Sequence, residues 1–140
     1  HMHYTESKLQ TDLAGKKILL VEDHKLNMEI AKKILEKKQM KVTCAYNGAE
    51  AVALFEKMPE YTFDAVIMDI RMPVMNGLEA AAAIRAGAKA DAKTIPIIAM
   101  SANAFAEDME KSRRAGMNRH VAKPVEPERL FGVLSEIFSD

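Results

Sequence analysis

Two short apolar runs in the sequence end abruptly in carboxylates. Residues 17–21 stop at Glu22 and Asp23, and residues 65–68 stop at Asp69. Apolar runs of this length, bounded by turn signals, are typical of strands that are buried on both faces of a parallel sheet. Ligands of open α/β sheets bind in the crevice at the carboxyl ends of the strands, so these three carboxylates are candidates for a functional site.

Two more polar residues follow later expected strands. Ser101 comes after residues 95–100, and Lys123 comes after residues 118–122. Carboxylates that are brought together repel one another, and a bound cation is one remedy. Oxygen ligands with room for water and a phosphate suit Mg²⁺. An ionised aspartate can itself attack phosphorus to form an acyl phosphate, and a lysine and a hydroxyl would then bind the phosphoryl oxygens.

Helical patterns separate the apolar runs and would position these five groups. The expected strands are residues 17–21, 40–46, 65–69, 95–100 and 118–122, and the expected helices are residues 26–38, 51–58, 78–85, 104–115 and 127–138. This alternation predicts βαβ units with right-handed crossovers. We therefore expect an α/β fold, a doubly wound three-layer (βα)5 sandwich around a five-stranded parallel sheet.

The expected helices differ in how much apolar surface they offer. In the first one, lysines and glutamates separate a stripe of four apolar residues, which are Leu26, Ile30, Ile34 and Leu35. Such a stripe is typical of an amphipathic helix. The expected helix 104–115 has only Phe105 and Met109 on its stripe, and Gly116 stands at its C-terminal end. A weak stripe is typical of a helix that is loosely held or that faces a partner.

The composition narrows the class of protein. With 140 residues, 49% of them hydrophobic, the chain is long enough for one well-buried core. Its 20 basic and 20 acidic residues give a net charge of zero, which disfavours contact with nucleic acid or with a membrane surface. Cys44 is the only cysteine, so an intrachain disulfide is impossible and a reducing compartment is favoured.

The sequence also predicts where the folded domain lies. It contains no signal-like segment and no apolar run of about 18 residues, so we expect a cytoplasmic protein or the cytoplasmic part of a membrane-bound one. Residues 1–15 are polar and aperiodic up to Gly15, which predicts a linker, and His1-Met2 resembles the remnant of a cleaved tag. We expect the domain to cover residues 16–140.

Taken together, the motifs resemble the receiver domain of two-component response regulators. The likeness covers roughly residues 16–138 and rests on four segments, which are Leu20-Val21-Glu22-Asp23, residues 68–77, Ala99-Met100-Ser101-Ala102 and Ala122-Lys123-Pro124. The resemblance implies a flavodoxin-like fold with the strand order 2-1-3-4-5. It also implies a signalling phosphoacceptor rather than an enzyme, with slow Mg²⁺-dependent autodephosphorylation.

The resemblance assigns roles to the acidic residues. Asp69 would accept the phosphoryl group. Asp23 and Asp69 would bind Mg²⁺ directly, or Mn²⁺ in its place, and Glu22 would hold the metal through water. The backbone carbonyl of Arg71 would complete the protein ligands.

The same resemblance assigns roles to the later motifs. Ser101 and Lys123 would bind the phosphoryl oxygens, and the Lys123-Pro124 bond is expected to be cis. Ser101 and residue 120 would form a switch, in which His120 stands where the family often carries Tyr or Phe, and a partly buried structural histidine is the alternative role for His120. A histidine there introduces a group that titrates near neutral pH. Asn76 stands where such loops often carry Asp, a change that should not affect the chemistry.

Several shorter segments indicate a subfamily and its partners. Residues 13–18, Asn27, and residues 101–105 and 116–118 are similar to receivers attached to hybrid sensor histidine kinases. The implied phosphoryl donor is a histidine kinase. A receiver from a hybrid kinase would relay the group to a histidine phosphotransfer protein, and a single-domain response regulator is the alternative.

Two other classes of function compete with this interpretation. A Mg²⁺-dependent phosphatase that forms an aspartyl phosphate is disfavoured because Ile70 and Arg71 follow Asp69, leaving no second aspartate two residues on to act as acid and base. A pseudo-receiver that serves only for docking is disfavoured by the complete acidic set. No Gly-rich phosphate loop follows any expected strand, so nucleotide binding has no support.

Overall fold

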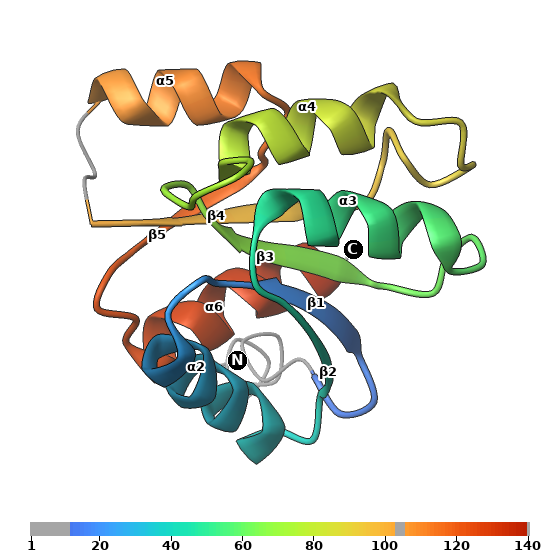
Figure 1. The fold of residues 1–140 in the computed structure, drawn as a ribbon. Helices are drawn as coiled ribbons and strands as arrows, with labels where there is room; N and C mark the ends of the chain where they lie inside the picture. The colour runs from blue at the N-terminus through green and yellow to red at the C-terminus, as the bar shows by residue number, and fades with distance from the viewer. Residues whose placement is uncertain (1–11, 103–105, 140) are drawn as a thin grey trace.

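The computed structural model describes residues 12–102 and 106–139, along which strands and helices alternate (Figure 1). The elements are β1 (Lys17–Val21), α2 (Lys25–Lys37), β2 (Lys41–Ala45), α3 (Gly48–Lys57), β3 (Ala65–Asp69), α4 (Gly77–Ala86), β4 (Ile97–Ser101), α5 (Ala106–Arg114), β5 (Arg119–Ala122) and α6 (Pro127–Phe138). The expected α/β alternation is confirmed. Residues 1–11, which include the expected tag remnant, and residues 103–105 lie outside the described part.

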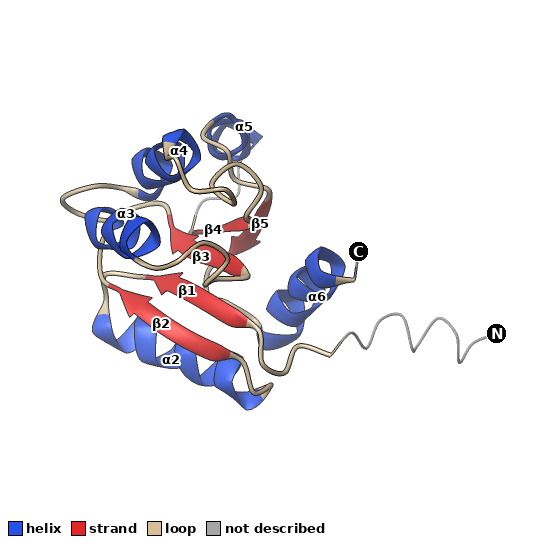
Figure 2. Cartoon of the chain, turned by 90° about the vertical axis from the view of Figure 1, so that its right-hand side faces the viewer, coloured by secondary structure: helices blue, strands red, loops and turns tan. Residues whose placement is uncertain are grey.

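The five strands form one parallel sheet in the order β2-β1-β3-β4-β5. Helices α2 and α6 cover one face, and α3, α4 and α5 cover the other (Figures 1 and 2). This arrangement is the predicted doubly wound, three-layer sandwich with the 2-1-3-4-5 order. Because every strand runs in the same direction, the carboxyl ends of all five meet at one edge of the sheet.

Each face of the sheet carries its own hydrophobic core. On β3, Val66 and Met68 pack among residues of α3 and α4, whereas Ala65 and Ile67 pack among residues of α2 and α6. All five residues of β3 are buried. Burial on both faces explains why this strand reads as a continuous apolar run rather than as an alternating one. Leu13, ahead of β1, is also buried in the second core.

The buried face of α2 differs from the predicted stripe. Its buried residues are Met28, Ala31 and Leu35, which are spaced three and four apart and share one side of the helix. Leu26 is 72% exposed and Ile30 is 50% exposed, so their predicted place on the inner stripe is wrong. Alanine and methionine contribute little to an apolar stripe in a sequence, yet here they fill the space between the helix and the sheet.

Two asparagines determine where helices begin beside the carboxyl ends of the strands. Asn47, expected in a turn, is the N-cap of α3, and its side chain accepts a hydrogen bond from the Glu50 amide. Asn76 is the N-cap of α4 and forms a reciprocal capping box with Glu79. The cap places the start of α4 at Gly77, one residue before the predicted start.

Helix α3 begins three residues before the predicted start, and the remaining boundaries agree with the sequence to within about two residues. β4 begins at Ile97 and includes Ser101, and β5 begins at Arg119. Gly116 follows α5 with a φ of 103°, the left-handed conformation that favours glycine at a helix end. Within the described residues, no helix is both long enough and apolar enough to span a bilayer.

Candidate functional site

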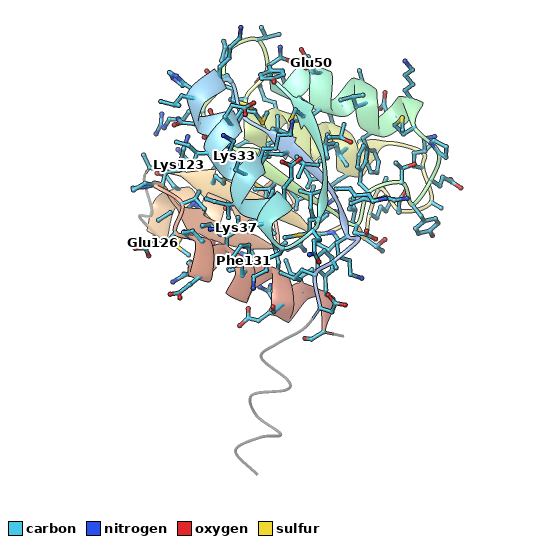
Figure 3. All side chains as sticks on the ribbon, turned by 90° about the horizontal axis from the view of Figure 1, so that it is seen from below. Lys33, Lys37, Glu50, Lys123, Glu126 and Phe131 are labelled. Atoms are coloured by element: carbon cyan, nitrogen blue, oxygen red, sulfur yellow. The ribbon has the colours of Figure 1, made fainter. Side chains whose placement is uncertain are left out.

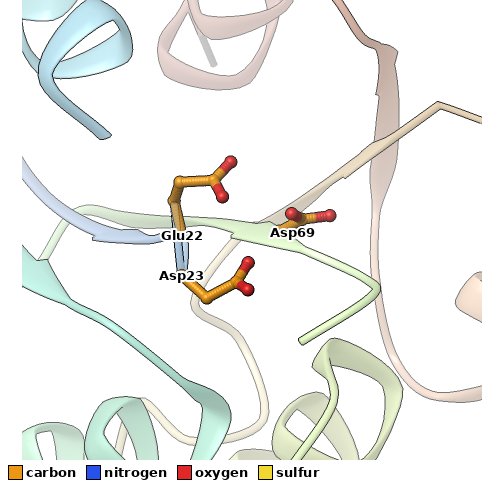
Figure 4. A group of neighbouring side chains, drawn as sticks. All are labelled: Glu22, Asp23 and Asp69. Carbon is orange, nitrogen blue, oxygen red and sulfur yellow. The ribbon is translucent and has the colours of Figure 1, made fainter. Parts of the chain in front are cut away.

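Three carboxylates meet at the carboxyl ends of β1 and β3. Oxygen atoms of Glu22, Asp23 and Asp69 all lie within 4.8 Å of one another (Figure 4). Glu22 is 1% exposed and Asp69 is 5% exposed, while Asp23 is half-buried at the opening of the group. The structure thus brings together the acidic residues that the sequence places after two different strands. Carboxylates so close and so poorly solvated require a compensating cation.

Lys123 supplies one positive charge to this group. It follows β5, and its Nζ atom donates to Asp69 Oδ2 at 2.9 Å and to Glu22 Oε1 at 3.0 Å. Burial alone would lower the pKa of Lys123, but the hydrogen bonds and charges of Asp69 and Glu22 outweigh it and raise that pKa. Lys123 is therefore held in its ammonium form, and one ammonium faces three carboxyl groups.

Backbone amides orient the two buried carboxylates. The amide of His24 donates to Glu22 Oε2 at 3.0 Å, and the amide of Arg71 donates to Asp69 Oδ1 at 3.3 Å. Glu22 and Asp69 each therefore receive one contact from the chain just after their own strand and one from Lys123. The Arg71 amide bond places the backbone of residue 71 beside Asp69, whereas the predicted role of its carbonyl as a ligand stays a prediction.

Ser101 occupies the end of the neighbouring strand. The sheet register pairs Asp69 with Met100 and Ser101 with Ala122, which places Ser101 between the strand that carries Asp69 and the one that precedes Lys123. Its carbonyl accepts the Lys123 amide at 2.9 Å, and the residue is buried. The Lys123-Pro124 bond is cis, as the resemblance implied.

His120 lies apart from the carboxylates, in the middle of β5 and paired with Ala99. Its Nε2 atom is buried and has no hydrogen-bond partner among the described residues. Burial lowers the pKa of His120, and the charge of Asp108 opposes that effect. The imidazole is therefore neutral at pH 7.

The loop from β3 to α4 is packed closely against the phosphoacceptor candidate. The Gly77 amide donates to the Ile70 carbonyl at 2.8 Å, and a Cβ atom on Gly77 would lie 2.2 Å from the backbone oxygen of Asp69. The capping box that starts α4 was visible in the sequence as Asn76 followed three residues later by Glu79. The predicted helix start at residue 78 did not take that signal into account.

The donor atoms of this group fit a hard divalent cation. Carboxylate oxygens are the ligands that Mg²⁺ prefers, and an ion of this kind is typically held by one or two carboxylates together with water and phosphate oxygens. Among the described residues, Glu22, Asp23 and Asp69 are the only three acidic, histidine or cysteine side chains close enough to share a metal ion. No nitrogen or sulfur ligand belongs to that set, which disfavours a softer metal.

Known proteins with the same pattern fall into one family. The model of the response regulator receiver domain matches residues 18–135. A hybrid signal transduction histidine kinase I of Dictyostelium discoideum is 35% identical over 127 residues, which cover 89% of this chain and 7% of that protein. Histidine kinase 3 of Arabidopsis thaliana is 34% identical over 149 residues, which cover 94% of this chain and 14% of that protein. The chain thus spans only a small part of the curated relatives it matches.

Solved structures agree with these relatives. The receiver domain of a sensor histidine kinase from Pseudomonas aeruginosa PAO1, crystallised with a magnesium ion in its active site cleft, is 36% identical with a TM-score of 0.81. The match covers 91% of this chain and all of that one. A chemotaxis protein of Vibrio cholerae has the same TM-score at 29% identity. That match covers 89% of this chain and all of the Vibrio chain. On this evidence the chain belongs to the response regulator receiver domain family.

Proposed function

We propose that this domain accepts a phosphoryl group from a phosphohistidine onto Asp69 and so serves as the receiver of a two-component phosphorelay. The observation that carries the proposal is the placement of Asp69, which is buried beside two further carboxylates and held by Lys123. The proposed domain extends over residues 16–140 and acts in the cytoplasm, and Leu13 of the preceding expected linker 1–15 packs into its second core.

The transfer needs no general base from the protein. A carboxylate oxygen of Asp69 attacks phosphorus, the P–N bond to the donor imidazole breaks, and its electron pair stays on the departing nitrogen. Asp23 and Asp69 would hold Mg²⁺ (Mn²⁺ as the substitute) directly, with the Arg71 carbonyl, and Glu22 would hold it through water. When bound, the metal neutralises charge on the phosphoryl oxygens.

Lys123 and Ser101 would then form hydrogen bonds to the phosphoryl group on Asp69. Each hydrogen bond to a charged group contributes roughly 1.5–3 kcal/mol, and reversing a two-state equilibrium from 1:99 to 99:1 needs about 5.5 kcal/mol. Two such bonds to the phosphoryl group supply about that amount. Ser101 moving inward would vacate space for His120 and change the surface formed by α5, β5 and α6.

The partners follow from the same chemistry. The donor is a histidine kinase, and the acceptor of the relayed group is a histidine phosphotransfer protein if the domain belongs to a hybrid kinase. A single-domain response regulator is the second arrangement. The domain itself is a signalling element whose own reaction is slow hydrolysis of the acyl phosphate.

Phosphoryl uptake is the direct test. We expect intact-mass spectrometry to show one added phosphoryl group after incubation with acetyl phosphate and Mg²⁺, and none in Asp69→Asn or without Mg²⁺. Fast hydrolysis can hide the adduct, so a beryllofluoride complex is measured in parallel. Absence of both the adduct and the complex in the wild type would overturn the proposal in favour of a docking pseudo-receiver.

Metal binding can be tested without any phosphoryl donor. Mg²⁺ at ten times its Kd should stabilise the wild type by about 1.4 kcal/mol, seen as a rise in Tm. Asp23→Asn should abolish most of this rise, and it should also raise the Tm measured in EDTA because it removes one of three repelling carboxylates. Glu29→Gln, on the exposed side of α2, is the matched control and should respond to Mg²⁺ like the wild type.

A further inference from the structure

A hollow of about 100 Å³ lies beside the acidic group, on the side of the sheet that α2 covers. Glu22, which points away from Asp23 in Figure 4, and Lys123 form its charged lining, and the 3.0 Å hydrogen bond described above joins these two residues. At the liquid volume of water, such a hollow holds roughly three molecules. The ion pair of Glu22 and Lys123 therefore borders free space rather than tightly packed side chains.

Asn27 of α2 also lines this hollow. It is the third residue of the helix, and it shares a side of the helix with Ile30 and Ala31, three and four positions further on, which line the hollow too. The half-buried Asn27 side chain makes no hydrogen bond to any described residue. Asn27 thus brings an amide with available donors to the edge of the acidic group.

The helix itself gives no reason for an asparagine at this position. Asparagine has a lower helix propensity than alanine, and at a helix start it helps chiefly as an N-cap. The N-cap of α2 is His24, and its first turn contains no acidic residue, although the helix dipole favours one there. Departures from local preference are expected at functional sites. A neutral amide can donate to a carboxylate, whereas an acidic residue would add to the repulsion.

Glu22 has few partners to lose. It is 1% exposed, and its two oxygens accept hydrogen bonds from the His24 amide and from Lys123. Among the described side chains that line the hollow, only those of Asn27 and Lys123 can donate, since the others are the Glu22 carboxylate and apolar groups. When Lys123 withdraws, Asn27 is therefore the side chain placed to donate to Glu22 Oε1.

Phosphorylation of Asp69 would draw Lys123 away from Glu22, and this step rests on the proposed function. A phosphoryl group carries a charge of about −1.5 to −2 at pH 7 and three acceptor oxygens, whereas Glu22 carries a single charge. Lys123 would follow the phosphoryl oxygens outward from its present place between the two carboxylates. Glu22 would then be a buried carboxylate without its ammonium partner, which is strongly unfavourable.

We propose that Asn27 is a positioning residue for Glu22, which donates its side-chain amide to Glu22 Oε1 when Lys123 turns to the phosphoryl group. The exchange lets Lys123 leave without stranding a buried charge. It also keeps the Glu22 carboxylate in place beside Asp23, so that the metal site and the phosphoryl site can be occupied together.

A double-mutant cycle tests the exchange without phosphorylation, so its failure is distinct from a failure of the proposed function. Lys123→Met imitates the withdrawal of Lys123. In urea unfolding with EDTA, Asn27→Ala should raise the unfolding equilibrium constant about tenfold more in Lys123→Met than in the wild type, the effect of one hydrogen bond to a charged group. The helix propensity of alanine acts in both backgrounds and cancels. Equal effects in the two backgrounds would overturn the exchange.

Lys33→Met, on the exposed side of α2, is the matched control for the cycle. Asn27→Ala should have the same effect in Lys33→Met as in the wild type. Asn27→Asp keeps the shape of the side chain but cannot donate, so in Lys123→Met it should raise the unfolding equilibrium constant more than Asn27→Ala does. Sucrose stabilises every protein of the cycle if Lys123→Met needs support to fold.

NMR provides a signature that a merely structural role of Asn27 would not produce. The side-chain amide protons of Asn27 should move downfield in Lys123→Met, as protons do when they gain a hydrogen bond to a carboxylate, and should return when Glu22→Gln is added. Those of Asn118, at the opposite edge of the sheet, should stay unchanged. Asn27 amide protons that do not move in Lys123→Met would overturn the proposal.

Discussion

Gly77→Ala is expected to lower the free energy of unfolding by about 3 kcal/mol, the upper part of the usual range for overpacking a tight site. The added Cβ would lie 2.2 Å from the Asp69 backbone oxygen and 2.9 Å from Ile70 Cα. Both obstacles are backbone atoms, so the strain cannot be relieved by turning a side chain. The loop must move away from β3, and Mg²⁺ affinity should fall with it because Asp69 begins that loop.

Gly132→Ala is the matched control for this change. Gly132 lies in the exposed face of α6, and a Cβ there would meet nothing within 4 Å. Replacing a helical glycine with alanine should raise the free energy of unfolding by about 0.5–1 kcal/mol. Urea unfolding of both variants measures the contrast. Equal stability of the two proteins would show that the loop adapts and that Gly77 is not needed for close approach.

Lys123→Met should lower the free energy of unfolding by about 2–3 kcal/mol in EDTA. Removing one partner of a buried ion pair costs roughly 3–5 kcal/mol, and the cost is smaller here because the Lys123 side chain is 21% exposed. Glu22 and Asp69 would then keep their buried charges with no ammonium beside them. Mg²⁺ should restore part of the loss, because it supplies positive charge to the same carboxylates.

The Lys123 effect has a specific pH dependence. The folded-state pKa of Lys123 is raised above its ordinary value of 10.5. Its contribution to stability is therefore complete below pH 10.5 and declines as the pH rises through the folded-state pKa. The difference between wild type and Lys123→Met in urea unfolding should accordingly shrink in that alkaline range and stay constant near pH 7.

Lys33→Met provides the control for Lys123. Lys33 projects from the exposed side of α2, on the face that Figure 3 shows. A change at such a surface position should stay within about 0.5 kcal/mol, with no response to Mg²⁺. If Lys123→Met were as stable as Lys33→Met, solvation by water, and not the charge of Lys123, would be what stabilises the acidic group.

The sequence predicted the sheet and the acidic site because both depend on strand ends. A strand buried on both faces must be apolar throughout, so its last residue can be identified where the first charge appears. Asp69 and Glu22 mark such points, and parallel topology brings them together. Ser101 ends another strand that is buried throughout, whereas β5 is short and carries Arg119 and His120, so Lys123 was predicted from its place after that strand and from the Ala122-Lys123-Pro124 motif.

Features that depend on how the helices pack against the sheet were harder to predict from the sequence. Met28 and Ala31 are buried on α2, whereas the more apolar Leu26 and Ile30 face outward, because the inner face is decided by how the helix lies on the sheet. The role of Arg85 as an anchor of Gly116 and Asn118 had no signal at all. Its partners are mostly carbonyls, which no residue type in the sequence reveals.

The hydrogen bond from Lys123 to Glu22 joins residues 101 positions apart in the chain, and the one to Asp69 joins residues 54 apart. Contacts of such long sequence separation form only after the intervening loops have closed. During synthesis on the ribosome, the acidic residues emerge long before the lysine that balances them. The acidic group therefore acquires its ammonium partner only once the chain has folded as far as β5.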